Sequence, residues 1–212
     1  DFRAQEPNKP GQYLITPEQY GQFLCEASDV WFNDGNPKRS VRFFDNILSV
    51  YLHQEAELCV HRQTCPKTLI LEQNGDAYPC DFYINDEYRL GNVGQDSLVD
   101  ILSNPKYDAF LGLKPNLPDN CRSCKYLHLC HGGCPRNRAW NQADDTVNPD
   151  YFCKSYLQLY SYGHERMERL AEIINRQWMQ NHHRSGRPKP KSNDICLCGS
   201  GKKFKKCCEK WL

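Results

Sequence analysis

Four closely spaced cysteines lie in the stretch Cys121-Arg-Ser-Cys124-Lys-Tyr-Leu-His-Leu-Cys130-His-Gly-Gly-Cys134, with the spacing CxxC-x5-C-x3-C. Thiols so close along the chain are poorly placed to bridge distant elements as disulfides, but they can surround a metal. The gaps of five and three residues fit no common zinc ribbon. They are typical of ferredoxin-type loops, in which the last cysteine can ligate a second cluster. The stretch therefore favours iron–sulfur binding.

Further cysteines flank this stretch on both sides. Cys59, Cys65 and Cys80 precede it and Cys153 follows, which gives eight thiols, enough for two four-cysteine sites. The spacing alone leaves zinc and disulfides open as alternatives to two iron–sulfur clusters. The chain has thirteen cysteines in all, an odd number that leaves one orphan in any disulfide scheme. The opening Asp-Phe-Arg-Ala-Gln does not look like a signal peptide, so we expect a cytoplasmic metal protein.

Charge and hydropathy separate the last thirty residues from the others. No run of about 18 apolar residues is present, so we expect no membrane span. The net charge is +1, but residues 182–212 carry nine Lys and Arg against two acids, a local charge of +7. The remaining residues therefore carry −6. The C-terminal segment is therefore strongly basic, whereas the rest of the chain is acidic.

Local patterns predict a mixture of helices and strands. Thr16-Pro-Glu-Gln19 predicts a helix start with a capping box, and apolar spacing predicts further helices over 41–52 and 155–180. Asn74-Gly75 between Thr68–Leu71 and Ala77–Ile84 predicts a β-hairpin with a type I′ turn. The sequence thus indicates an α+β fold.

The cysteine pattern as a whole resembles a known family. It is similar to the seven-cysteine SPASM signature of radical S-adenosylmethionine (SAM) enzymes. The matching positions are Cys65-x9-Gly75-x4-Cys80, then the 121–134 stretch, then Cys153. With Cys59 added, it resembles the eight-cysteine form of the anaerobic sulfatase maturases. Three sequence segments around these cysteines also resemble that subfamily: Tyr78-Pro-Cys-Asp-Phe82, Tyr88-Arg-Leu-Gly-Asn92 and Cys130-His-Gly-Gly-Cys-Pro-Arg136. The resemblance covers about residues 10–165.

That resemblance implies two auxiliary [4Fe–4S] clusters and a ligand set for each. The first set is Cys59, Cys65, Cys80 and Cys134. The second set is Cys121, Cys124, Cys130 and Cys153. The chain has no Cx3Cx2C loop, which radical SAM enzymes use to hold the cluster that cleaves SAM. SAM and a third [4Fe–4S] cluster are therefore expected outside it, and alone it should not generate a radical.

The resemblance also assigns a role to Asp81, which directly follows Cys80. In the maturases the matching aspartate is proposed to deprotonate the substrate cysteine or serine while it is oxidised to formylglycine. An ordinary carboxylate is a weak base toward a thiol, but partial burial beside the cluster would raise its pKa. The residues alone favour an aspartate that caps a turn. With the resemblance, we expect Asp81 to be the catalytic base.

A second cysteine motif lies at the end of the chain. Cys196, Cys198, Cys207 and Cys208 stand in a Lys- and Gly-rich stretch that resembles the SEC-C motif. Four thiolates suit tetrahedral zinc, and so short a segment needs its metal in order to fold. Its lysines could bind the ribosome, nucleic acid or an acidic protein, or form only a solvated surface. Cys25 is left over and is expected to be a buried helix residue.

The two resemblances imply four segments and the partners of the family. Residues 1–55 are expected to be the helical end of a radical SAM partial TIM barrel, 56–181 a SPASM domain, 182–194 a basic linker and 195–212 the zinc motif. The expected partners are an unfolded or nascent sulfatase polypeptide and a flavodoxin- or ferredoxin-type electron donor. Two rivals remain: another peptide-modifying SPASM enzyme, and a freestanding iron–sulfur electron carrier or binding module.

Overall fold

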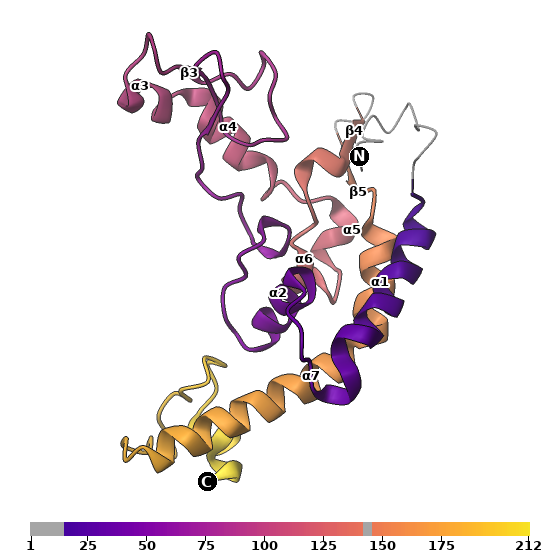
Figure 1. The fold of residues 1–212 in the computed structure, drawn as a ribbon, viewed down its shortest axis with the longest axis vertical. Coiled ribbons are helices and arrows are strands. Elements are labelled where there is room, and N and C mark those ends of the chain that lie inside the picture. Colours follow the sequence, from indigo (N-terminus) through magenta and orange to yellow (C-terminus); the bar gives the residue numbers. More distant parts are fainter. Residues whose placement is uncertain (1–14, 142–145) are drawn as a thin grey trace. The chain divides into compact units, whose positions relative to one another are not determined.

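The computed structural model describes residues 15–141 and 146–212, which divide into two compact units. One unit is built from residues 62–153, and the other from residues 16–61 and 154–212 (Figure 1). Helices and short strands are both present, which confirms the mixed α+β class. Residues 1–14 of the predicted barrel segment lie outside the described residues. This division falls inside the predicted 56–181 domain, because residues 154–181 belong to the same unit as residues 16–61.

The two N-terminal helices begin where the sequence predicts. Helix α1 spans Pro17–Phe32, and Thr16 caps it through its side chain while Gln19 completes the capping box. Helix α2 spans Arg42–Tyr51, and two short 3-10 turns follow α1 and α2, η1 at Asn33–Gly35 and η2 at Cys59–His61. Cys25 is buried in α1, as expected.

Helix α7, Cys153–Arg184, is longer than the predicted 155–180. It runs beside α1 (Figure 1) because Gly21 permits a close approach. A Cβ on Gly21 would lie 3.2 Å from the Cα of Ser155, whose hydroxyl donates to the Pro17 carbonyl at 2.6 Å. The helix includes the first three residues of the predicted 182–194 linker.

The zinc-type tail packs on α7. It contains two 3-10 turns, η4 at Phe204–Lys206 and η5 at Cys208–Trp211. Met179 of α7 is 1% exposed and shares a core with three tail residues, Cys196, Phe204 and Cys208. The tail thus shares a core with the helix that precedes the predicted 182–194 linker.

Three short antiparallel strands form the sheet of the other unit. They are β1 Ile70–Leu71, β2 Asp76–Tyr78 and β3 Gly91–Asn92, in the order β1-β2-β3. The hairpin is confirmed, but its turn is not type I′. Gly75 N–H donates to the Glu72 carbonyl at 2.9 Å, and only Gly75 of the Asn74-Gly75 pair has a positive φ. The turn is a three-residue loop in which glycine takes the left-handed position.

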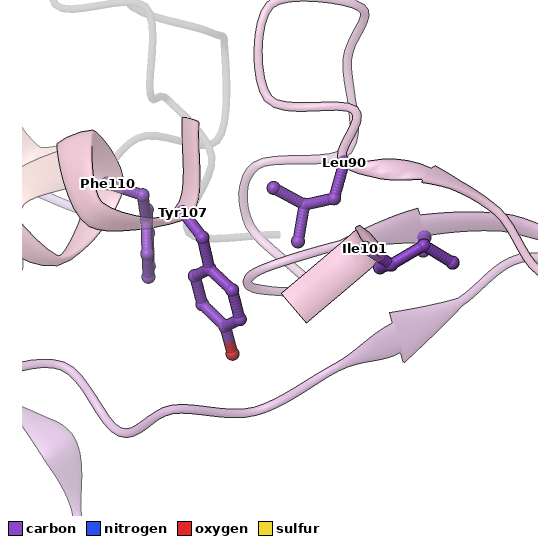
Figure 2. Close-up of a cluster of buried hydrophobic side chains, with 5 residues drawn as sticks. Leu90, Ile101, Tyr107 and Phe110 are labelled. Atoms are coloured by element: carbon purple, nitrogen blue, oxygen red, sulfur yellow. The ribbon is translucent and has the colours of Figure 1, made fainter. Parts of the chain in front are cut away.

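A small core lies between this sheet and two helices, α3 at Leu98–Leu102 and α4 at Pro105–Leu113. Figure 2 shows four of its side chains, Leu90, Ile101, Tyr107 and Phe110. Ala77 belongs to the same buried cluster. Cys65 and Cys80 pack against this cluster. The core thus fixes the hairpin that two of the predicted ligands, Cys65 and Cys80, flank.

The remaining elements of this unit form part of the quoted cysteine stretch or follow it. They are α5 Asp119–Arg122, α6 Leu127–Cys130, η3 Pro135–Asn137, and the antiparallel pair β4 Arg138–Asn141 and β5 Thr146–Asp150. None of the helices in the described part of the chain is long and apolar enough to cross a membrane.

Candidate metal centres

The cysteine loop turns back on itself through three successive residues with positive φ. His131, Gly132 and Gly133 have φ values of 46°, 77° and 73°. A Cβ on Gly133 would lie 2.2 Å from Oδ2 of Asp150, so no larger residue fits without displacing that carboxylate. The two glycines of the quoted stretch are thus required by conformation and by space.

Asp150 is a buried carboxylate between two predicted ligands. Its Oδ2 accepts the backbone N–H of Cys134 at 2.9 Å, and its Oδ1 accepts that of Phe152 at 2.8 Å, one residue before Cys153. Burial raises the pKa of Asp150, and the hydrogen bonds from these N–H groups oppose that shift. One side chain therefore fixes the backbone next to a ligand of each predicted set.

Two buried cations hold the same loop from the other side. Arg138 donates from Nε to the Gly132 carbonyl at 2.9 Å and from Nη1 to the Asn116 carbonyl at 2.8 Å. Lys114 donates from Nζ to the Gly133 carbonyl at 2.8 Å. Sequence reasoning missed Lys114, Arg138 and Asp150. No local sequence pattern identifies these three residues, because their contacts depend on the path that the cysteine loop takes in the folded chain.

The second predicted set is brought together within one unit. Cys153 faces Cys121, Cys130 and Cys124 closely enough for each thiolate to affect its ionisation. Burial, followed by these negative neighbours, raises the pKa of Cys153 to about 11. Burial likewise raises the pKa of Cys121 and Cys130. Such thiols lose their protons readily only when a metal supplies the balancing positive charge.

Three members of the first set also converge. Cys65, Cys80 and Cys134 all lie near the ring hydroxyl of Tyr83, whose pKa is raised by burial and then by these thiols. Burial raises the pKa of Cys80 to about 12, while the Phe82 N–H faces its sulfur. Cys59 is exposed and belongs to the other unit, so its membership of this set stays a prediction.

Asp81 is exposed, so the partial burial expected for its side chain is not found. Its Oδ1 accepts a hydrogen bond from the Cys80 thiol at 3.4 Å. The residues after it line an open groove of about 540 Å³, with Phe82, Tyr83 and Arg136 among its walls. The guanidinium of Arg136 lies over the Phe82 ring at 4.9 Å. A carboxylate thus stands beside a predicted cluster ligand, and the residue that follows it lines an open groove.

The four tail cysteines form a much tighter group. The sulfur atoms of Cys196, Cys198, Cys207 and Cys208 all lie within 4.8 Å of one another. Zn–S bonds of about 2.3 Å place tetrahedral sulfurs roughly 3.8 Å apart, so a single zinc ion fits this donor set. Burial alone would raise the pKa of Cys198, but hydrogen bonds from Ser200 and from neighbouring cysteines outweigh it and lower that pKa.

The two kinds of site differ in spacing. Among the residues that the structure describes, only the tail brings three or more ligand atoms within 4.8 Å. In the part of the chain that the structure describes, the other cysteine sets are not gathered as tightly as the tail group. All thirteen cysteines have free thiols, so no disulfide consumes these donors.

Two family models match parts of the chain. The SPASM model, an iron–sulfur cluster-binding domain, matches residues 63–125. The SEC-C motif matches residues 193–210. The first confirms that the wide cysteine region is of an iron–sulfur-binding type, and the second confirms the tail motif.

Similar proteins carry a common description. The chain is 32% identical over 167 residues to a serine-type anaerobic sulfatase-maturating enzyme of Bacteroides thetaiotaomicron, covering 78% of this chain and 40% of that protein. It is 33% identical over 165 residues to a cysteine-type enzyme of Clostridium perfringens, covering 76% and 44%. The chain therefore spans less than half the length of these relatives.

A solved structure shares the fold. The structure of native anSMEcpe with bound AdoMet and the Cp18Cys peptide is 32% identical, with a TM-score of 0.70, over 77% of this chain and 46% of that one. The same protein with bound AdoMet alone gives a TM-score of 0.69. Sequence and fold thus point to one set of relatives, and these include both serine-type and cysteine-type enzymes.

Proposed function

The chain is a relative of the anaerobic sulfatase-maturating enzymes, with a SPASM domain and a SEC-C motif, and from that premise we propose that it is the C-terminal part of a radical SAM maturase. The whole enzyme would oxidise a cysteine or serine of a sulfatase to formylglycine. Its substrate would be an unfolded or nascent sulfatase polypeptide, and a flavodoxin- or ferredoxin-type protein would supply electrons. It would act in the cytoplasm.

The convergence of distant cysteines carries this proposal. Cys153 meets a set that begins 32 residues earlier, at Cys121, and Cys134 meets Cys65 and Cys80 of the hairpin region. We assign Cys121, Cys124, Cys130 and Cys153 to one [4Fe–4S] cluster. We assign Cys59, Cys65, Cys80 and Cys134 to the other. When bound, these clusters supply a one-electron acceptor beside the substrate.

This chain's own residues would hold the substrate and take its proton. The groove beside Phe82 and Arg136 would accept the polypeptide, and Asp81 would receive the proton from the substrate's sulfur or oxygen. Here Cys80 donates to Asp81. A thiolate ligand has no proton to donate, so cluster binding at Cys80 leaves the Asp81 carboxylate available as a base. Its exposure gives the substrate access.

The tail would bind one zinc ion through its four cysteines. Its basic face would offer a site for the ribosome or for an acidic protein. SAM and the third [4Fe–4S] cluster would be held by a segment that contains a Cx3Cx2C loop.

Metal analysis of the reconstituted chain tests the assignment. We expect about eight irons, eight sulfides and one zinc per chain, since two four-cysteine clusters and one zinc site use twelve cysteines. Mössbauer spectroscopy should show only [4Fe–4S] signals. Iron that saturates at four, with no loss in Cys59→Ser or Cys153→Ser, would refute the two-cluster assignment. Cys25→Ser is the matched control and should change nothing.

A further inference from the structure

The open groove beside Phe82 is lined by residues that closely follow two predicted ligands of the first set. Phe82 stands two residues after Cys80, and Arg136 stands two residues after Cys134. None of the described lining residues is a cysteine. The groove is therefore a space next to the first cysteine set, and not the space between the thiols themselves.

One wall of the groove is anchored in the core. The Tyr83 ring packs edge-on against the Tyr88 ring, with 4.6 Å between their centroids, and against the Phe110 ring at 5.2 Å. Phe110 is 1% exposed and belongs to the core beneath the sheet. Because this wall is already ordered, binding a ligand in the groove costs it little conformational entropy.

Two arginines line the groove, and they differ in what they bind. Arg138 is buried, and its guanidinium donates to the carbonyls of Gly132, Leu113, Lys114, Asn116 and His131. Arg136 is half-buried, and its guanidinium lies over the Phe82 ring at 4.9 Å. In the part of the chain that the structure describes, no carboxylate forms an ion pair with Arg136. Its N–H groups are thus available to a ligand.

The other polar groups of the groove favour a peptide main chain over an acidic side chain. Asn85 and Asn116 are exposed in its lining, and each side-chain amide has donors and an acceptor, as a peptide group does. Glu87 is exposed in the same lining, and Asp81 immediately precedes Phe82. These two carboxylates would repel an acidic ligand, but not a carbonyl oxygen.

We propose that Arg136 is a positioning residue that donates to main-chain carbonyl oxygens of the substrate polypeptide and so holds it beside the first cysteine set. The inference rests on the proposed maturase function, because it names the part of that substrate which the groove recognises. Stacking on Phe82 restricts the guanidinium before the substrate binds, so less side-chain entropy is lost. Main-chain carbonyls of a folded protein are already paired, so this site selects an unfolded segment.

Peptide binding to the reconstituted 212-residue chain, measured by fluorescence anisotropy, tests this role. One labelled probe is a sulfatase-derived peptide that contains acidic residues. The other is the same peptide with Asp and Glu replaced by Asn and Gln and with an amidated C-terminus. In Arg136→Gln we expect the dissociation constant to rise about tenfold for both probes, the order of one charge-assisted hydrogen bond. Arg136→Lys keeps the charge but loses the planar fork, so it should restore only part of the affinity.

Arg122→Gln is the matched control. Arg122 directly follows the predicted ligand Cys121, but it is exposed and is not among the described residues of the groove. Its loss should leave both dissociation constants unchanged. In a longer form that also carries a Cx3Cx2C loop, Arg136→Gln should raise KM about tenfold and keep kcat within about a factor of two, as loss of uniform binding does.

The remaining outcomes count against the inference. Weaker binding of the acidic probe alone would show that Arg136 binds a carboxylate, and would overturn main-chain recognition. Unchanged binding in Arg136→Gln would overturn it too, as would a loss of iron, because Arg136 would then hold the cysteine loop. A wild-type chain that binds neither probe would refute the groove as the substrate site, and that result tests the proposed function before any variant is made.

Discussion

The two cysteine sets of residues 62–153 share one loop but differ in their surroundings. Cys80 of the first set has an exposed carboxylate and an open groove beside it. The second set lies behind the buried side chains of Lys114, Arg138 and Asp150. The difference is one of exposure: the side chain beside Cys80 is open to solvent, whereas the side chains that hold the loop of the second set are buried.

Replacing Asp81 should give the largest effect and tests the open side of this comparison. In a longer form that also carries a Cx3Cx2C loop, Asp81→Asn should lower formylglycine production on a sulfatase-derived peptide by about 10²–10⁴, the usual cost of losing a general base. SAM cleavage should continue and become uncoupled from product. Product and 5′-deoxyadenosine are measured together by mass spectrometry.

Asp86→Asn is the matched control, because Asp86 is another exposed aspartate of the same segment. It should keep near wild-type activity. Formylglycine at the wild-type rate in Asp81→Asn would return Asp81 to a turn-capping role. Iron is counted in both variants, and a loss in Asp81→Asn would show that this position serves the cluster.

Filling the space at Gly133 tests the rigid side of the comparison. Gly133→Ala places a Cβ against Asp150 at a φ of 73°, so it should destabilise the folded loop by about 2–5 kcal/mol. We expect the variant to lose iron from both sets, since Asp150 contacts Cys134 N–H of the first set and Phe152 N–H next to Cys153 of the second, and both contacts must break. Iron analysis and thermal unfolding measure the two effects.

Gly112→Ala is the control for that substitution. Nothing lies within 4 Å of a Cβ at this position of α4, so alanine should leave the iron unchanged and add up to about 0.5–1 kcal/mol of stability. Full iron content in Gly133→Ala would show that the loop tolerates a shift of Asp150.

The contrast between these sets also marks what could be predicted from sequence. The Thr16 capping box and the spacing of α1, α2 and α7 depend on local chemistry, and the structure confirms those helices. The spacing of the cysteines in the sequence predicted an iron–sulfur-binding region, because the spacing of ligands within one loop is a local property. The prediction of a type I′ turn at Asn74-Gly75 was wrong, because the register of the two strands, and not this dipeptide, determines the length of the loop.

Buried charges could not be predicted in this way. Arg138, Lys114 and Asp150 lie far apart in sequence from some of the groups that they contact, such as Asn116 and Gly133. The docking of the tail was also missed. A basic stretch with two prolines predicts a free linker, yet the apolar side chain of Phe204 needed a partner, and Met179 on α7 provides it.

Removing the tail should have the smallest effect on the two cysteine sets and extends the comparison to the third metal site. The tail contacts α7 through Met179, through an ion pair between Lys210 and Glu172 at 3.2 Å, and through Arg176 over the Trp211 ring. No predicted cluster ligand is among these residues. Deleting residues 190–212 should therefore remove the zinc and leave iron and visible absorbance unchanged.

The deletion should nevertheless loosen the end of α7. Met179 loses its cover, and helix ends without packing partners fray, so amide exchange over residues 172–184 should become faster. Zinc chelation in the intact chain should reproduce this change, because so small a core depends on its metal to stay folded. The Glu172→Gln variant breaks only an exposed ion pair, worth less than about 0.5 kcal/mol, and should leave exchange nearly unchanged. A fall in iron on deletion would show that the tail supports the clusters. Unaltered exchange on deletion would show that its contact with α7 contributes nothing to the helix.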